Sequence, residues 1–206
     1  MIKAVIFDLG RVIIPFDFQH AYAMIEDRYG VPKAQISARL AQTNLVQRFE
    51  SGEIESRDFV RQISAHLNLD LTYDAFCEIW SSVFSPETLI PEEMLRGIAR
   101  NYRLVLLSNT NAIHFEMIRE RYPHIQHFHA LVLSYKAGAL KPLPLIYQKA
   151  IEAANCLPGE CFFTDDIQAY VEAACALGID AVQFQSVTQV ERELRKRGVV
   201  WNDSTC

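Results

Sequence analysis

No run of apolar residues in this 206-residue chain approaches the roughly 20 that a helix needs to cross a bilayer, so we expect no membrane-spanning segment. Positive charge is not in excess: 20 Lys and Arg face 25 Asp and Glu, and a net charge of -5 argues against a nucleic-acid partner. The five cysteines include no C-x-x-C pair, which indicates reduced thiols rather than a disulfide framework. The chain passes from Met1 straight into a strand-like run, so no signal peptide is expected. These features predict a cytoplasmic globular protein.

Short apolar runs, several of them rich in β-branched residues, recur along the chain, as expected of strands that are buried on both faces of a sheet. They lie at residues 2–7, 102–107, 130–133, 161–164 and 181–184. Helical patterns fill the intervals, with one helix beginning after Pro91 and others expected at residues 112–121, 145–154, 170–177 and 187–197. Strand and helix in alternation predict an α/β fold, with a Rossmann-like parallel sheet and helices on both of its faces.

One long segment departs from this alternation. Residues 16–85 contain only amphipathic helical stretches, which we place at residues 20–29, 32–45, 57–67 and 73–84. We therefore expect a helical cap at residues 16–85, inserted into a catalytic core formed by residues 1–15 and 86–206. Ligands of doubly wound sheets bind beyond the carboxyl ends of the strands, where this insertion must emerge. The last residues, 202–206, are expected to be frayed.

Side chains capable of chemistry follow the predicted strands or precede a helix at the same edge of the sheet. They are Asp8, Ser108 with Asn109, Lys141, and the pair Asp165 and Asp166. This set suits phosphoryl transfer in which Asp8 attacks phosphorus, while Mg²⁺ holds the nucleophile and the phosphate together despite their shared negative charge. Mg²⁺ favours a few carboxylates together with waters and phosphate oxygens, as the acidic pair would supply.

With its order of motifs, the sequence resembles the haloacid dehalogenase superfamily, whose members are mostly phosphatases. The motifs are "VIFDLG", "LLSNT", "LKP" before a helix, and "FFTDD", and the match covers nearly the whole chain. Within the superfamily, the sequence is most similar to bacterial phosphatases with a small helical cap that act on α-D-glucose 1-phosphate. The phosphatase-like N-terminal domain of soluble epoxide hydrolase is more distantly similar.

The resemblance implies a role for each motif residue. Asp8 would be the nucleophile and a Mg²⁺ ligand, with the Gly10 carbonyl and Asp166 as further ligands and Asp165 acting through water. The phosphate would be bound by Ser108, Asn109 and Lys141. The expected substrate is a small phosphorylated metabolite, and the oligomeric state is left open.

Gly10 departs from the commonest phosphatase pattern, which has an aspartate two residues after the nucleophile. That aspartate moves protons, which a backbone carbonyl cannot do, and such help is typically worth ~10²–10⁴-fold in rate. An anomeric phosphate needs less protonation because its leaving hemiacetal oxygen is less basic, so Gly10 favours a substrate such as glucose 1-phosphate. A second departure is Tyr170, where relatives often carry asparagine.

Two further groups of residues each allow more than one interpretation. In the cap, Gln47, Arg48 and Glu50 precede a glycine turn, and they either contact a sugar or form a solvated helix end. The cluster His124, His127 and His129, with His114 nearby, is weak evidence for zinc because it lies at a helix-to-strand connection.

Two other functions compete with the phosphatase. A 2-haloacid dehalogenase would need no metal, and both Gly10 and the acidic pair of Asp165 and Asp166 count against it. A binding module that kept the fold and the metal site but lost turnover with the acid would release no phosphate.

Overall fold

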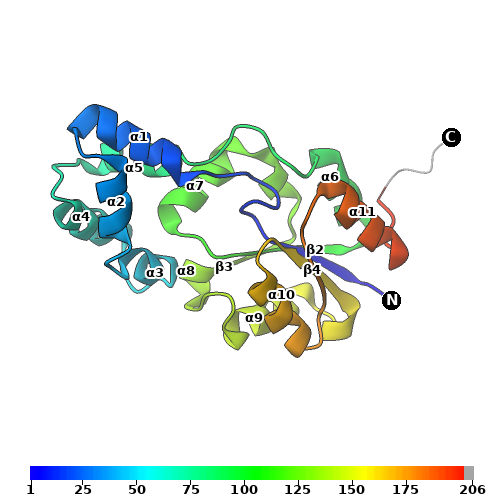
Figure 1. The fold of residues 1–206 in the computed structure, drawn as a ribbon. Helices are drawn as coiled ribbons and strands as arrows, with labels where there is room; N and C mark the ends of the chain where they lie inside the picture. Colours follow the sequence, from blue (N-terminus) through cyan, green and yellow to red (C-terminus); the bar gives the residue numbers. More distant parts are fainter. Residues whose placement is uncertain (202–206) are drawn as a thin grey trace.

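The computed structural model describes residues 1–201, so the tail expected to be frayed lies outside the described residues. Its core is a five-stranded parallel sheet of order β3-β2-β1-β4-β5 (Figure 1). The strands are β1 (Ala4–Phe7), β2 (Arg103–Ser108), β3 (Ala130–Leu133), β4 (Cys161–Asp165) and β5 (Asp180–Gln183). In the register, Phe7 of β1 pairs with Leu106 on one side and Thr164 on the other. Residue 8 therefore lies beside the ends of both neighbouring strands.

Helices cover both faces of the sheet, which confirms the predicted Rossmann-like fold (Figure 1). One layer contains α6 (Glu92–Asn101), α7 (Ala112–Arg121) and α11 (Val187–Lys196), and the other contains α9 (Pro144–Ala154) and α10 (Gln168–Ala176). Short helices η1 (Pro123–His127), α8 (Ser134–Ala137) and η2 (Pro158–Glu160) complete the connections.

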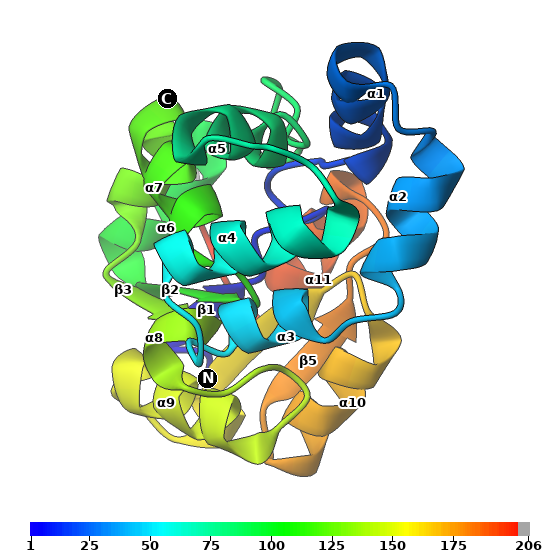
Figure 2. The same ribbon diagram turned by 90° about the vertical axis from the view of Figure 1, so that its left-hand side faces the viewer.

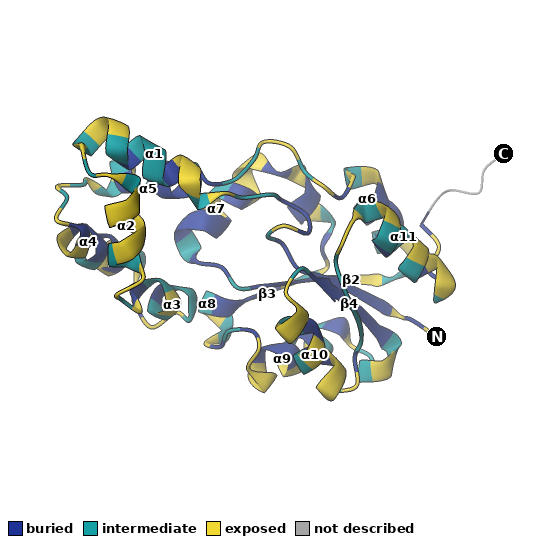
Figure 3. Ribbon diagram, viewed as in Figure 1, coloured by how far each residue is buried: buried dark blue, intermediate teal, exposed yellow. Residues whose placement is uncertain are grey.

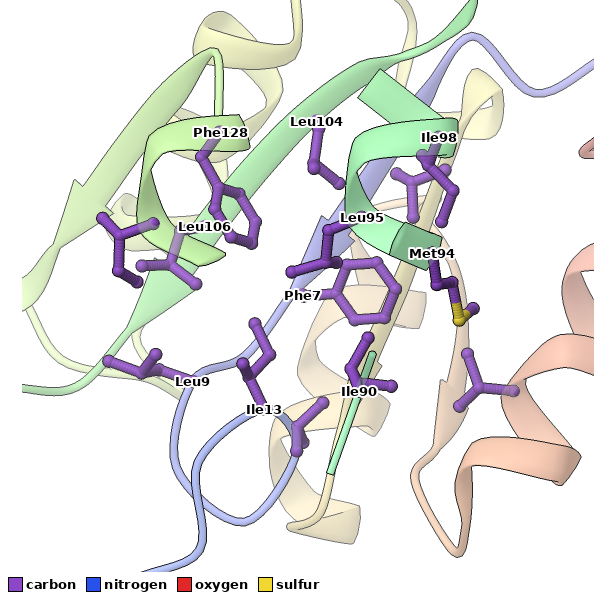
Figure 4. Packing of buried hydrophobic residues seen from close by; sticks show 14 of the residues in the cluster. Phe7, Leu9, Ile13, Ile90, Met94, Leu95, Ile98, Leu104, Leu106 and Phe128 are labelled. Atoms are coloured by element: carbon purple, nitrogen blue, oxygen red, sulfur yellow. The ribbon is translucent and has the colours of Figure 1, made fainter. Parts of the chain in front are cut away.

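The central strand β1 is apolar throughout because its alternate side chains enter different cores. Val5 and Phe7 pack in the cluster with α6 and α11, whereas Ala4 and Ile6 pack in the cluster with α9 and α10. Figure 4 shows the first cluster, in which Phe7 lies beside Leu95 of α6. The burial colouring of Figure 3 shows the same pattern, with the central strands dark blue and the outer helix faces yellow.

Between β1 and α6 lie helices without an intervening strand: α1 (Phe18–Tyr29), α2 (Lys33–Leu40), α3 (Leu45–Glu50), α4 (Ser56–Leu67) and α5 (Tyr73–Ser81). They form a layer beyond the carboxyl ends of the strands (Figures 1 and 2). Their cluster of buried residues is largely their own but includes Ile113 of α7. The helix predicted at residues 32–45 is instead divided into α2 and α3. The division is stabilised locally, because the Thr43 hydroxyl accepts a hydrogen bond from the backbone of Leu45 at 3.2 Å.

The chain enters and leaves this helical layer through two adjacent segments. Phe16 and Phe84 form an antiparallel bridge, and the Asp17 amide donates to the Val83 carbonyl at 2.8 Å. We propose residues 16 and 85 as the boundaries of the cap. None of the helices within residues 1–201 is both long and apolar enough to cross a membrane.

Candidate active site

A buried lysine joins two of the predicted carboxylates. Lys141 lies in the loop before α9, and its Nζ donates to Asp8 Oδ1 at 2.6 Å and to Asp165 Oδ2 at 2.5 Å. It also donates to the Leu107 carbonyl at 3.3 Å. All three charged side chains are buried, with Asp8 7%, Lys141 3% and Asp165 0% exposed. The sheet therefore brings these three predicted residues together at its carboxyl edge.

The charges of this cluster depend on one another. Burial raises the pKa of Asp8, while the ammonium of Lys141 opposes the rise and the charge of Asp165 adds to it. Burial acts on Lys141 in the opposite sense and lowers its pKa, but the two carboxylates outweigh burial, so the net pKa is raised. Lys141 is therefore an ammonium ion that neutralises part of the acidic charge of Asp8 and Asp165.

Asp8, Asp165 and Asp166 present carboxylate oxygens that all lie within 4.8 Å of one another. The two oxygens of Asp165 are engaged, one by Lys141 and the other by the Ile167 amide at 2.9 Å. Asp166 is half-buried, and its carboxylate makes no hydrogen bond to another residue within the described chain. Burial and the charge of Asp165 raise the pKa of Asp166. Clustered carboxylate oxygens fit Mg²⁺, which takes hard oxygen ligands.

Asn109 has a positional role that the sequence did not reveal. Its Oδ1 accepts from the Lys141 amide at 2.8 Å, and its Nδ2 donates to the Lys141 carbonyl at 3.1 Å. The same Nδ2 lies 3.5 Å from the Tyr170 hydroxyl, and the Tyr170 ring centroid is 5.1 Å from Lys141 Nζ. Ser108, buried at the end of β2, has its Oγ 3.4 Å from the Asn109 carbonyl. Asn109 thus fixes the backbone that carries Lys141, and Tyr170 forms one wall of the cluster.

A cavity of about 80 Å³ lies between the cap and the end of the sheet. The core lines it with Gly10, Ser108 and Asn109, and the cap contributes Glu50 at the end of α3. Its remaining walls are Leu9, Phe16, Phe18, Val83, Phe84, Thr110 and His114. Of the cap residues considered from the sequence, Arg48 is not part of this lining. It instead pairs with Glu53, with Nε and Oε2 3.4 Å apart.

Phe16 fills the space beside Gly10. A Cβ atom added at residue 10 would lie 2.7 Å from Cε1 of the Phe16 ring. That ring contacts the rings of Phe18 and Phe84, at centroid distances of 5.7 and 5.9 Å, and the Arg11 guanidinium lies 4.8 Å from its centroid. With the Phe16 ring in this position, any side chain at residue 10, including the aspartate of the commonest phosphatase pattern, would overlap the ring.

The four histidines considered for zinc have separate partners. His114 contacts the Trp80 carbonyl at 2.8 Å, and His127 contacts Glu92 at 2.8 Å. His124 lies 3.0 Å from the Thr88 hydroxyl, and His129 accepts from the Leu104 amide at 3.0 Å. Within residues 1–201, the acidic trio at the sheet edge is the one cluster of three or more potential metal ligands, and it contains no histidine. The zinc alternative gains no support.

Comparison with known proteins agrees with the motifs. Residues 2–178 match the family model of haloacid dehalogenase-like hydrolases. The chain is 28% identical, over 203 residues, to D-ribitol-5-phosphate phosphatase from Bacteroides thetaiotaomicron, covering 94% of this chain and 97% of that protein.

Two solved structures share the fold. A haloacid dehalogenase family enzyme from Bacteroides thetaiotaomicron, in complex with magnesium and inorganic phosphate, superposes with a TM-score of 0.80 at 25% identity, over 91% of this chain and 96% of that one. A predicted HAD-like family hydrolase from Porphyromonas gingivalis also gives a TM-score of 0.80 at 25% identity, over 95% and 98% of the two chains. Since the family model covers most of its length, the chain belongs to the haloacid dehalogenase-like hydrolase family.

Proposed function

We propose that this hydrolase is a Mg²⁺-dependent phosphatase of a small phosphorylated metabolite and that it works through an aspartyl-phosphate on Asp8. The observation that carries the proposal is the buried ammonium of Lys141 between Asp8 and Asp165, with the Asp166 carboxylate beside them. A buried, lysine-paired carboxylate at the end of a central strand is suited to attack an anionic phosphoester, because the ammonium offsets the charge of both.

Asp8, Asp166 and the Gly10 carbonyl would hold Mg²⁺, and Asp165 would act through a water. When bound, the ion neutralises charge between the nucleophile and the phosphate. Lys141 holds Asp8 in place, and Ser108 offers a hydroxyl to the phosphate oxygens. Asp8 attacks phosphorus, the bond to the ester oxygen breaks and an alcohol leaves. Water then attacks the aspartyl-phosphate, which releases phosphate and restores the Asp8 carboxylate.

Two substrates are favoured by different observations. The absent side chain at Gly10 favours glucose 1-phosphate, whose leaving oxygen needs little protonation. The phosphatase of Bacteroides thetaiotaomicron named for D-ribitol 5-phosphate, by contrast, supports a polyol phosphate with a primary ester oxygen. We therefore propose a sugar or polyol phosphate as the substrate class.

Phosphate release with Mg²⁺ should be measured for glucose 1-phosphate, glucose 6-phosphate and D-ribitol 5-phosphate, with Asp8→Asn as the blank. We expect release from at least one of them and none from the blank. A strong preference for the 1-phosphate supports the explanation based on Gly10, and equal rates remove it. Release that persists after chelation of the metal contradicts the proposed Mg²⁺ dependence, and no release from any compound favours the binding module.

A further inference from the structure

Glu50 is a carboxylate without a partner in the cavity. It ends α3 and faces the same space as Gly10 and Ser108. No hydrogen bond or ion pair joins its side chain to another residue of the described chain, in contrast to Glu53 three positions later, which bonds Arg48 and Ser51. Glu50 is half-buried. Removing an unpaired carboxylate from water disfavours its charged form, and groups perturbed in this way cluster at functional sites.

The surroundings of Glu50 keep its proton available near neutral pH. Burial raises the pKa of Glu50 to about 7. The other titratable side chain in the cavity lining is His114. Burial lowers its pKa to about 4, and its two ring nitrogens contact Trp80 and Asn111. His114 is therefore neutral and does not compensate a charge on Glu50, so Glu50 is the group in this lining that can both give and take a proton.

We propose that Glu50 performs the proton transfers for which residue 10 has no side chain; this rests on the proposed phosphatase function. Phe16 occupies the place beside Gly10, so the proton must come from another wall of the cavity. The cavity of about 80 Å³ exceeds the ~10–15 Å³ that one water requires, so the leaving oxygen or the hydrolytic water has room beside Glu50.

Glu50 gives up one proton in the first step and regains one in the second. In the first, Asp8 attacks phosphorus, the ester bond breaks, and the leaving oxygen takes the proton of the Glu50 carboxyl, which becomes a carboxylate. In the second, the Glu50 carboxylate takes a proton from water as the water oxygen bonds to phosphorus. The bond between Asp8 and phosphorus then breaks, which frees phosphate and leaves Glu50 protonated for the next turnover.

The test compares Glu50→Gln with Glu55→Gln, the same change at an exposed carboxylate of the cap. With Mg²⁺ present, kcat of Glu50→Gln for an alkyl phosphate such as D-ribitol 5-phosphate should fall by ~10²–10⁴-fold, whereas Glu55→Gln should match the wild type. With p-nitrophenyl phosphate, whose leaving group needs no proton, Glu50→Gln should release about one equivalent of nitrophenolate in a burst and then turn over slowly. Glu50→Asp, which keeps a titratable carboxyl, should recover part of the loss.

A rise in KM with kcat unchanged would assign Glu50 to substrate recognition alone and overturn the proposal. Equal losses on both substrates without a burst would also overturn it. These results differ from failure of the phosphatase function itself, in which the wild type releases no phosphate or Asp8→Asn remains active. Thermal unfolding of each variant separates a change in catalysis from a change in folding.

Discussion

The packing of Phe16 against Gly10 leads to a quantitative prediction for Gly10→Ala. The added Cβ would lie 2.7 Å from Cε1 and 3.2 Å from Cδ1 of the ring, whereas carbon atoms in good contact are about 3.5–4.0 Å apart. Moving the ring away would disturb its contacts with Phe18 and Phe84. Residue 10 does not have a positive φ, so steric overlap is the main cost. Overpacking of this kind costs about 1–3 kcal/mol.

Urea and thermal unfolding measure this cost directly. For a chain of this size, each kcal/mol lowers Tm by roughly 2–4 °C. The control is the same change in a Phe16→Ala background, where the ring is absent and the cost of Gly10→Ala should largely disappear. If Gly10→Ala costs nothing, or costs the same with and without the ring, the ring does not fill the space beside Gly10 and the explanation for the missing aspartate is wrong.

Two other predictions concern the carboxylates. Because the pKa of Glu50 in the folded chain is about 7, above its ordinary value of 4.5, the wild type should lose stability as the pH rises between these values. Urea titrations give the unfolding free energy of Glu50→Gln and of the wild type at each pH. The variant's free energy minus that of the wild type should increase by on the order of 2 kcal/mol from pH 5 to pH 8. A difference that stays constant over this interval would contradict the prediction. Mg²⁺ at about 100 times its Kd should stabilise the wild type by about 2.7 kcal/mol. Asp166→Asn should lose most of that gain in calorimetry, and an undiminished gain would exclude Asp166 as a ligand.

The sheet and the grouping of polar residues at its carboxyl edge were predictable for one physical reason. Strands buried on both faces are continuously apolar, and parallel strands place their carboxyl ends at the same edge. The sequence alone therefore predicts that Asp8 and Asp165 lie close together. The contacts of Asn109 with Lys141 were not predictable, since they join segments 32 positions apart in sequence and depend on the path of a loop.

In the cap, the sequence pattern predicts helices but not where each one ends or which side chains line the cavity. Amphipathic periodicity predicts one helix across residues 32–45, but local hydrogen bonding at Thr43 competes with the helix and separates α2 from α3. The sequence pattern groups Arg48 with Glu50, although residues two apart on a helix do not share a face. That rule alone separates them, and the structure places Glu50 in the cavity and Arg48 against Glu53.

Helix α7 has a consequence for exchanging caps between related enzymes. It packs on the sheet, yet Ile113 in its first turn belongs to the buried cluster of the cap, and His114 contacts the carbonyl of Trp80 in α5. The Trp80 and His114 rings also stack, with centroids 5.3 Å apart. If a cap from another enzyme replaced residues 16–85, Ile113 and His114 in that first turn would lose the cap residues that they contact. A functional chimera must therefore redesign the start of α7 together with the insertion.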